Sequence, residues 1–194
     1  TAVVEMAPLP GGTCLHWGCI PTKALLHAAE VLETSRHAGR FGVKVTPGEL
    51  DVPGVQKYKD KVVLTNAKGV EYLLKKGGIT LVPGRGKLAG PGKVVVAQTD
   101  GGTKTITTKF TIVATGSVIR GLPGVEFDGK QIINSDHALS LKQVPASMIV
   151  LGAGAVGVEF ASIYATFGAK VTIVELLPRL IPLEDAALGA ELEK

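Results

Sequence analysis

A glycine-rich turn in the last third of the sequence constrains the fold more than any other feature. Residues 148–169, MIVLGAGAVGVEFASIYATFGA, have the pattern of a buried strand, a glycine turn and an amphipathic helix. Residues 170–175, KVTIVE, follow as a second buried strand that ends in glutamate. Strand, turn, helix and strand together predict a βαβ unit, which is the core of a dinucleotide-binding fold.

The glycines of this turn have the spacing G-x-G-x-x-G, each with its own physical role. Gly152 allows a tight turn after the strand, Gly154 lets backbone amides approach a pyrophosphate, and Gly157 lets the helix pack close to the strand. The phosphate then sits at the helix N-terminus. Glu175, 23 positions after Gly152, can bond a ribose 2′-hydroxyl and repel a 2′-phosphate. The pattern therefore favours NAD over NADP.

The first residues repeat the end of this unit. TAVVE at 1–5 is, like KVTIVE, a buried-strand run ending in an acid. If Glu5 is also a ribose ligand, the same spacing puts its glycine turn before residue 1, and the chain begins within a first nucleotide-binding fold. The alternative is an N-terminal strand whose glutamate is merely solvated.

The segment between the two copies has a different pattern. Residues 55–76 predict a helix that stops at Gly77 and Gly78. Short β-rich runs follow, separated by turn sequences, and they predict a meander of three strands at 80–82, 93–98 and 105–110. This segment is therefore not another βαβ unit.

A last apolar run precedes the glycine turn. FTIVATGS at 110–117 predicts a buried strand ending in small residues, and Pro123-Gly124 begins a looping connection. We therefore expect a first domain at 1–118, a linker at 119–144, and the start of a second domain at 145–194.

Composition bears on the two cysteines because it sets their redox context. The sequence lacks an apolar run of membrane-helix length and a signal-peptide pattern, so we expect a cytoplasmic protein with no membrane partner. The net charge of +4, from 21 basic and 17 acidic residues, is scattered, which argues against nucleic acid. In a reducing compartment, a cysteine pair is more often catalytic or metal-binding than structural.

Both cysteines lie at the start of a predicted helix. Pro21, which is tolerated in a first helical turn, and apolar residues between Ala24 and Leu32 predict a helix beginning near Cys19. The positive end of the helix dipole, and Lys23 one turn further on, both favour a thiolate at Cys19.

The residues alone leave three interpretations of the pair open. A Cys14–Cys19 disulfide is geometrically feasible if the chain turns sharply at Gly18, and it would give thiol–disulfide exchange the asymmetry it needs. A zinc site could recruit His16 or His27, although a second Cys/His cluster is missing. Two buried, inert thiols are the third interpretation.

Several motifs in one order now point to a family. GGTCLHWGCIPTKALL resembles the redox-disulfide signature of the flavin-dependent pyridine-nucleotide disulfide oxidoreductases, above all of members that oxidise dihydrolipoamide. The likeness runs along the whole chain, through TAVVE, VPGRGKLAGPGKV, TIVATGS, INSDHALSLKQVP and GAGAVGVE. It implies an α/β fold with two Rossmann-like domains, one for FAD and one for NAD, both incomplete in this chain.

The resemblance also implies roles for individual residues. The expected FAD-binding residues are Glu5, Gly11, Gly12, Thr13, Cys14, Lys23, Gly86, Thr115, Gly116 and Ser117. The expected NAD-binding residues are Gly152, Gly154, Ala155, Val156, Gly157, Glu159 and Glu175. Cys14 would attack the substrate disulfide, Cys19 would be the flavin-side thiolate, and Lys23 and Glu159 would form an ion pair beside the nicotinamide. No metal is expected.

The implied reaction passes electrons from dihydrolipoamide to the Cys14–Cys19 disulfide, then to FAD and NAD⁺. The implied partners are the lipoyl domain of a 2-oxoacid dehydrogenase or glycine cleavage complex, and a second subunit in a homodimer. Glutathione-reductase-like and mercuric-reductase-like enzymes share the dithiol helix, but they generally use NADPH, which Glu175 disfavours.

Two features set limits on this resemblance. His16-Trp17 replaces the Asn-Val most often found between the two cysteines, which could reshape the entrance to the dithiol. A truncated chain that binds nucleotide without turnover is the non-enzymatic alternative. We expect these 194 residues alone not to oxidise dihydrolipoamide, because the first glycine turn, the later strands and a C-terminal histidine would lie outside them.

Overall fold

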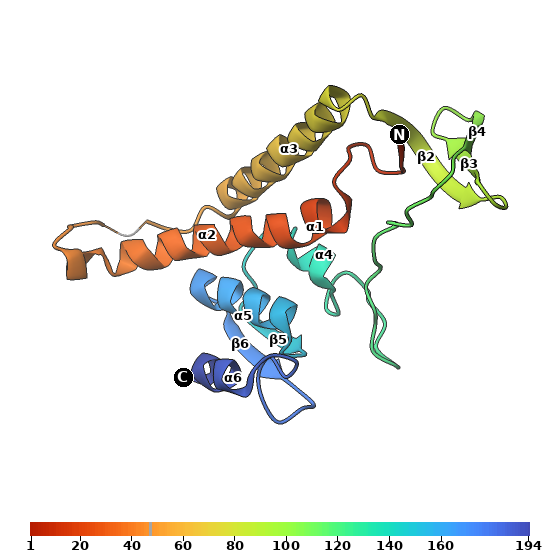
Figure 1. The fold of residues 1–194 in the computed structure, drawn as a ribbon. Helices are drawn as coiled ribbons and strands as arrows, with labels where there is room; N and C mark the ends of the chain where they lie inside the picture. The colour runs from red at the N-terminus through yellow and green to blue at the C-terminus, as the bar shows by residue number, and fades with distance from the viewer. Residues whose placement is uncertain (47) are drawn as a thin grey trace.

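The computed structural model describes residues 1–46 and 48–194. Two long helices, α2 (Cys19–Arg36) and α3 (Val52–Lys76), form the middle of the molecule. A sheet lies beyond the far end of α3, and a small βαβ unit lies against α2 on the side away from α3 (Figure 1). The start of α2, with Cys19 as its first residue, thus lies between the two sheets.

The first sheet changes from parallel to antiparallel pairing along one strand. Its order is β1 (Ala2–Glu5), β2 (Thr80–Leu88), β3 (Lys93–Gln98) and β4 (Thr103–Thr107). Residues 80–83 pair in parallel with β1, and residues 84–88 pair antiparallel with β3. The predicted strand at 80–82 was therefore too short, because Pro83-Gly84 marks a change of partner rather than a turn. The strand predicted at 105–110 is β4, which ends at Thr107.

The helices follow their sequence signals closely. α2 begins at Cys19, as predicted, while the short helix α1 (Gly12–Trp17) before it was not foreseen. α3 begins three residues earlier than predicted because the Asp51 side chain caps it, accepting a hydrogen bond from the Gly54 amide at 3.0 Å. It ends before Gly77, as expected. A short 3₁₀ helix, η1 (Ala38–Phe41), follows α2.

The second unit is the predicted βαβ motif. Strand β5 (Ser147–Leu151) leads through the glycine turn into α5 (Ala155–Phe167), and β6 (Lys170–Val174) returns parallel to β5. Helix α4 (Ser135–Ala138) precedes this unit, and α6 (Ala186–Glu193) follows it. The division into domains at residues 118 and 145 stays a prediction, although the stretch 108–134 between the sheets has no helix or strand.

The strand expected at 110–117 is wrong. This run is irregular, and Phe110 and Ile112 are 88% and 91% exposed. A β-strand is stabilised by the ladder of hydrogen bonds to its neighbours, and the described part of the chain supplies no strand that pairs with this run. Its β propensity alone does not form one.

The main core lies where α2 and the α4 segment pack against the βαβ unit. It is built around Leu25 of α2 and includes Ala138, Leu139, Phe160, Ile163, Tyr164 and Ala169. Burying these side chains excludes water from the α2–α5 contact, so the core fixes the glycine-turn helix against the cysteine helix. Within the described residues, every helix is too short or too polar to cross a lipid bilayer.

Candidate redox and nucleotide site

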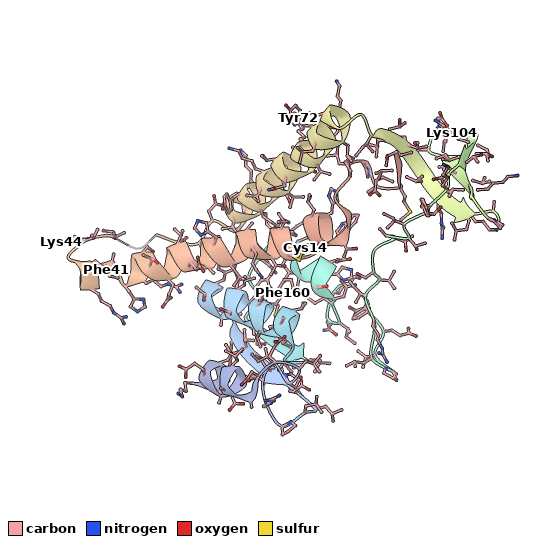
Figure 2. The ribbon with its side chains drawn as sticks, viewed as in Figure 1. Cys14, Phe41, Lys44, Tyr72, Lys104 and Phe160 are labelled. Atoms are coloured by element: carbon pink, nitrogen blue, oxygen red, sulfur yellow. A yellow bond between two sulfur atoms is a disulfide. The ribbon has the colours of Figure 1, made fainter. Side chains whose placement is uncertain are left out.

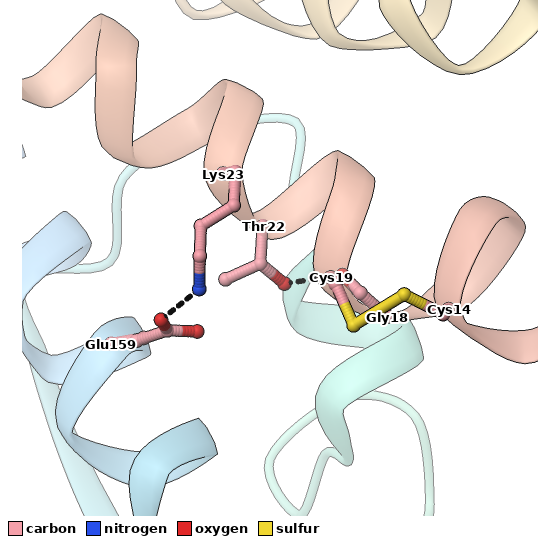
Figure 3. Close-up of a disulfide and its surroundings, with 6 residues drawn as sticks. All are labelled: Cys14, Gly18, Cys19, Thr22, Lys23 and Glu159. Atoms are coloured by element: carbon pink, nitrogen blue, oxygen red, sulfur yellow. Dashed lines mark hydrogen bonds and ion pairs between the residues drawn. A yellow bond between two sulfur atoms is a disulfide. The ribbon is translucent and has the colours of Figure 1, made fainter. Parts of the chain in front are cut away.

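The two cysteines form a disulfide at the junction of two helices. Cys14 lies in α1, Cys19 is the first residue of α2, and Gly18 separates the helices (Figures 2 and 3). Their sulfur atoms are bonded and their Cα atoms are 4.8 Å apart. Both residues are exposed, so the interpretation as buried, inert thiols is wrong. An exposed disulfide is open to attack by an external thiolate.

The start of α2 is held by a buried threonine. The Thr22 hydroxyl donates to the Gly18 carbonyl oxygen at 2.7 Å, and the Thr22 amide donates to the same oxygen at 3.2 Å (Figure 3). These bonds fix the first turn, so Cys19 stays at the positive end of the dipole of an 18-residue helix. That location stabilises negative charge on its sulfur.

An ion pair joins the cysteine helix to the helix after the glycine turn. The ammonium group of Lys23, one turn beyond Cys19, contacts Glu159 Oε1 of α5 (Figure 3). The two residues are 136 positions apart in the sequence. The predicted ion pair is therefore present, whereas its place beside a nicotinamide stays a prediction.

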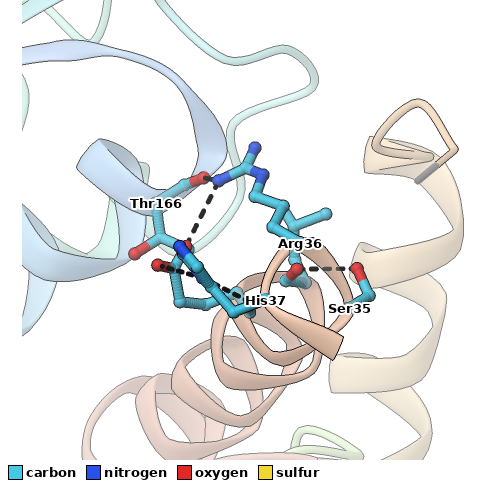
Figure 4. A network of polar contacts seen from close by, with 6 residues as sticks. Ser35, Arg36, His37 and Thr166 are labelled. Atoms are coloured by element: carbon cyan, nitrogen blue, oxygen red, sulfur yellow. Dashed lines mark hydrogen bonds and ion pairs between the residues drawn. The ribbon is translucent and has the colours of Figure 1, made fainter. Parts of the chain in front are cut away.

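A second polar contact joins the other ends of the same helices. Arg36 Nη1 donates to the Thr166 carbonyl oxygen at 2.7 Å, at the C-terminal end of α5 (Figure 4). A guanidinium is well placed there because helix C-terminal carbonyls carry partial negative charge. Together with the Lys23–Glu159 ion pair near the N-terminal ends, this bond fastens α2 to α5 at both ends of the apolar core.

The glycine turn has the geometry expected of a dinucleotide cradle. A Cβ at Gly157 would lie 2.0 Å from the Gly152 oxygen, so only glycine lets α5 come this close to the turn. Gly154 caps α5 and faces open space, leaving room for a ligand at the helix N-terminus, where Ala155 and Val156 begin α5. Oriented amides at a helix start form a phosphate-binding site.

Glu175 lies against this turn. Its carboxylate accepts hydrogen bonds from the amides of Ala153 at 2.6 Å, Leu176 at 2.7 Å and Leu177 at 2.9 Å. These backbone bonds, the Ala153 bond most of all, hold the pKa of Glu175 below its usual value. Glu175 is therefore charged at neutral pH and lies at the end of β6, at the edge of the open turn.

The expected flavin-side residues fall into two groups. Glu5 ends β1, its carboxylate accepts from the Ala7 amide at 2.8 Å, and it lines a cavity of about 330 Å³ with Leu81, Pro83 and four others. Gly86 lies in β2 beside Val4 of β1. Its role toward FAD stays a prediction.

The second group meets at the start of α1, where Gly11 is the N-cap residue and Gly12 is the first residue of the helix. Thr13 Oγ1 accepts a hydrogen bond from the Ser117 amide at 3.4 Å, across 104 residues of sequence. Gly116 has φ of +80°, and a Cβ there would lie 2.8 Å from Thr13 Oγ1. The structure thus brings the predicted segment Thr115–Ser117 to α1, the helix that carries Cys14, even though residues 110–117 do not form a strand.

Sequence reasoning missed the residues that fasten the units together. Arg36, Gln56, Lys59 and Tyr164 all bond to backbone oxygens of distant segments. Such contacts leave no local spacing signal because carbonyl acceptors exist at every residue. Only the structure could identify them.

Comparisons with known proteins agree with this geometry. A family model described as pyridine nucleotide-disulphide oxidoreductase matches residues 1–194. The chain is 48% identical over 194 residues to a dihydrolipoyl dehydrogenase of Chlorobaculum tepidum and 44% identical over 201 residues to one of Bacillus subtilis. Both alignments include the whole of this chain, but the chain spans only 41% and 42% of those relatives' length.

A solved structure has the same fold. The crystal structure of LpdA from Mycobacterium tuberculosis superimposes with a TM-score of 0.89 at 26% sequence identity. The match covers 99% of this chain and 42% of that one. Fold and sequence comparisons therefore agree along the entire chain.

Proposed function

Since the chain belongs to the pyridine nucleotide-disulphide oxidoreductase family, we propose that it is the disulfide-bearing part of an FAD-dependent dihydrolipoyl dehydrogenase. The reaction oxidises dihydrolipoamide and reduces NAD⁺. One observation carries the proposal: an exposed Cys14–Cys19 disulfide lies at the start of α2, and α2 is joined to α5, the helix after the glycine turn, by the Lys23–Glu159 ion pair.

The residues present fit both cofactors. The cavity beside Glu5 at the end of β1 suits a ribose, and the contact between Thr13 and Gly116 gives close backbone approach near the disulfide. The open turn at Gly154, with charged Glu175 beside it, suits the pyrophosphate and ribose of NAD. When bound, FAD would supply the electron carrier between the dithiol and the nicotinamide.

The dithiol step can be written from the chain's own atoms. A thiolate of dihydrolipoamide attacks Cys14 Sγ, a bond forms between the two sulfurs, and the Cys14–Cys19 bond breaks with its electron pair on Cys19 Sγ. The second substrate thiolate then attacks the first substrate sulfur and releases Cys14 as a thiolate. Lipoamide is the oxidised product, the cysteine pair is reduced by two electrons, and two protons leave the substrate.

The geometry supports this assignment of the two sulfurs. Cys19 begins the long helix α2, so the leaving thiolate develops where the helix dipole stabilises it, and a stabilised thiolate leaves faster. Lys23, one turn further along the same helix, adds a positive charge near that sulfur. Cys14, exposed on α1, is then the sulfur that meets the substrate.

Partners follow from the proposed substrate. A lipoyl group carried by the lipoyl domain of a 2-oxoacid dehydrogenase or glycine cleavage complex would deliver the dithiol, and the enzyme would work as a homodimer. Support for this comes from the relatives, which are dihydrolipoyl dehydrogenases, and from the exposure of Cys14 and Cys19, which leaves the disulfide within reach of a carried dithiol.

The test is an assay of the purified holoenzyme carrying this chain. We expect dihydrolipoamide-dependent reduction of NAD⁺, and Cys14→Ser should reduce it to background because the attacked sulfur is gone. Trp17→Phe, which leaves both cysteines in place, is the matched control and should retain activity. Dihydrolipoamide oxidation that is unaffected by Cys14→Ser, or its absence from the wild-type enzyme, would refute the proposal.

A further inference from the structure

A buried lysine outside the redox site has an unusual set of partners. Lys59 of α3 is only 6% exposed. Its ammonium group donates to Gln56 Oε1 at 2.7 Å and to the Leu139 carbonyl oxygen at 2.8 Å, and it lies 3.1 Å from the carboxylate of exposed Asp60. Gln56 in turn donates to the Leu141 carbonyl oxygen at 3.2 Å. Two side chains of α3 thus hold the segment that follows α4.

The same short segment is held from its other side by α5. The Tyr164 hydroxyl donates to the Ala138 carbonyl oxygen, one residue before the carbonyl that Lys59 binds. Burial raises the pKa of Tyr164 to about 12, so the hydroxyl stays a donor at neutral pH. The C-terminal end of α4 is therefore fastened to α3 and to α5 at once.

This segment belongs to the core that sets the redox geometry. Leu139 packs in one buried cluster with Leu25 of α2 and Phe160 of α5. Lys23 lies two residues before Leu25, and Glu159 lies immediately before Phe160. A shift of the α4 segment would therefore move α5 relative to α2, and the Lys23–Glu159 contact with it.

Stability alone does not account for a lysine here. Burying an ammonium group is costly even when it is hydrogen-bonded, and apolar side chains of similar size are often as stable in such sites. A methionine would fill the space without burying a charge, but it would leave the Leu139 oxygen without this donor. What only the lysine provides is a directional bond to the Leu139 oxygen.

We propose that Lys59 is a positioning residue that holds the α4 segment in place and thereby aligns the glycine-turn helix with the disulfide helix. The proposal rests on the proposed function, because the alignment matters for electron transfer between flavin and nicotinamide. It does not involve the exchange between dithiol and disulfide, which takes place on α1 and α2 alone.

The experiment compares Lys59→Met with Lys57→Met, an exposed lysine two residues earlier on the same helix. Stopped-flow absorbance of the holoenzyme measures flavin reduction by NADH and, separately, by dihydrolipoamide. In Lys59→Met we expect the NADH reaction to slow about tenfold or more, since small misplacements are costly, and the dihydrolipoamide reaction to stay within about twofold. Lys57→Met should match wild type in both, and Lys59→Arg, which keeps a cationic donor, should recover most of the NADH rate.

Hydrogen–deuterium exchange gives a readout that does not depend on activity. Peptides covering 135–142 and 155–167 should exchange faster in Lys59→Met, whereas peptides of α1 and the first turn of α2 should not change. Lys57→Met should leave all of these peptides as in wild type.

The outcomes separate this inference from the proposed function. A wild-type enzyme that fails either flavin reaction refutes the proposed function, and the exchange data still test the positioning role. If Lys59→Met slows both reactions equally, slows neither, or leaves the exchange of 135–142 unchanged, the positioning role is refuted. Should Lys59→Met not fold, Gln56→Met takes its place with the same expected pattern, and wild-type behaviour of that variant would refute the inference.

Discussion

Replacing Gly157 by alanine tests the close packing of the glycine turn. The new Cβ would lie 2.0 Å from the Gly152 oxygen, 3.1 Å from its carbonyl carbon and 3.3 Å from Val150 Cγ1. Real Cβ atoms essentially never come within 3.0 Å of such atoms, so α5 and the turn must separate by about 1 Å. The closest contact is with a backbone oxygen, which cannot rotate away as a side chain could.

The magnitude follows from two opposing effects. Overpacking of a rigid site costs about 1–3 kcal/mol, and a backbone clash belongs at the upper end. Alanine is the better helix former by about 1 kcal/mol, which offsets part of that cost. We therefore expect a net loss of about 2 kcal/mol in the free energy of unfolding, together with weaker NAD⁺ binding because the phosphate-binding amides move.

The matched control is Gly69→Ala in α3. Its Cβ meets nothing within 4 Å, so only the gain in helix propensity remains, and the variant should be stabilised by up to about 1 kcal/mol. Urea unfolding measures the change in the free energy of unfolding, which should have opposite signs in the two variants. Calorimetric titration measures their NAD⁺ affinity. A Gly157→Ala protein as stable as Gly69→Ala, with unchanged NAD⁺ affinity, would refute the close-packing argument.

Three further predictions concern the site and its supports. In two-electron-reduced holoenzyme, Cys19→Ser should abolish a long-wavelength thiolate-to-flavin absorbance band, whereas Cys14→Ser should keep the band and stop disulfide exchange. A band that survives only in the Cys19 variant would reverse the roles assigned to the two sulfurs. Glu175 should favour NAD⁺ over NADP⁺ in kcat/KM by about tenfold or more, about 1.4 kcal/mol, and equal values would contradict this. Tyr164→Phe should cost about 1–3 kcal/mol by removing the donor to the Ala138 oxygen. Burial raises the pKa of Tyr164 to about 12, so the hydroxyl donor is fully present at neutral pH and is lost only as the pH rises through about 12. An alkaline absorbance titration in which all tyrosines ionise near pH 10 would be incompatible with this burial.

Local signals in the sequence were sufficient for the parts of the fold that local chemistry decides. The βαβ unit around Gly152 and Gly157, the start of α2 at Cys19 and the end of α3 at Gly77 all depend on turn, cap and periodicity signals within a few residues. The Lys23–Glu159 pair was expected only through a family resemblance, since 136 residues separate its members.

Features that depend on distant partners could not be predicted in this way. Residues 110–117 have strand propensity, but pairing decides whether a strand forms, and the run is exposed. β2 runs on through Pro83-Gly84 because it exchanges one neighbouring strand for another. The bonds from Arg36 and Lys59 end on backbone oxygens, which have no sequence signature.

The most direct test of the proposed redox disulfide is a count of free thiols at Cys14 and Cys19. The tryptic peptide that ends at Lys23 contains both cysteines, so mass spectrometry after alkylation of the holoenzyme reports them together. We expect no alkyl groups on the oxidised enzyme, two after anaerobic treatment with dihydrolipoamide, and none again once NAD⁺ has been added in excess. Alkylated cysteines in the oxidised enzyme, or a peptide that stays unlabelled after dihydrolipoamide, would contradict the proposal that this pair carries the electrons.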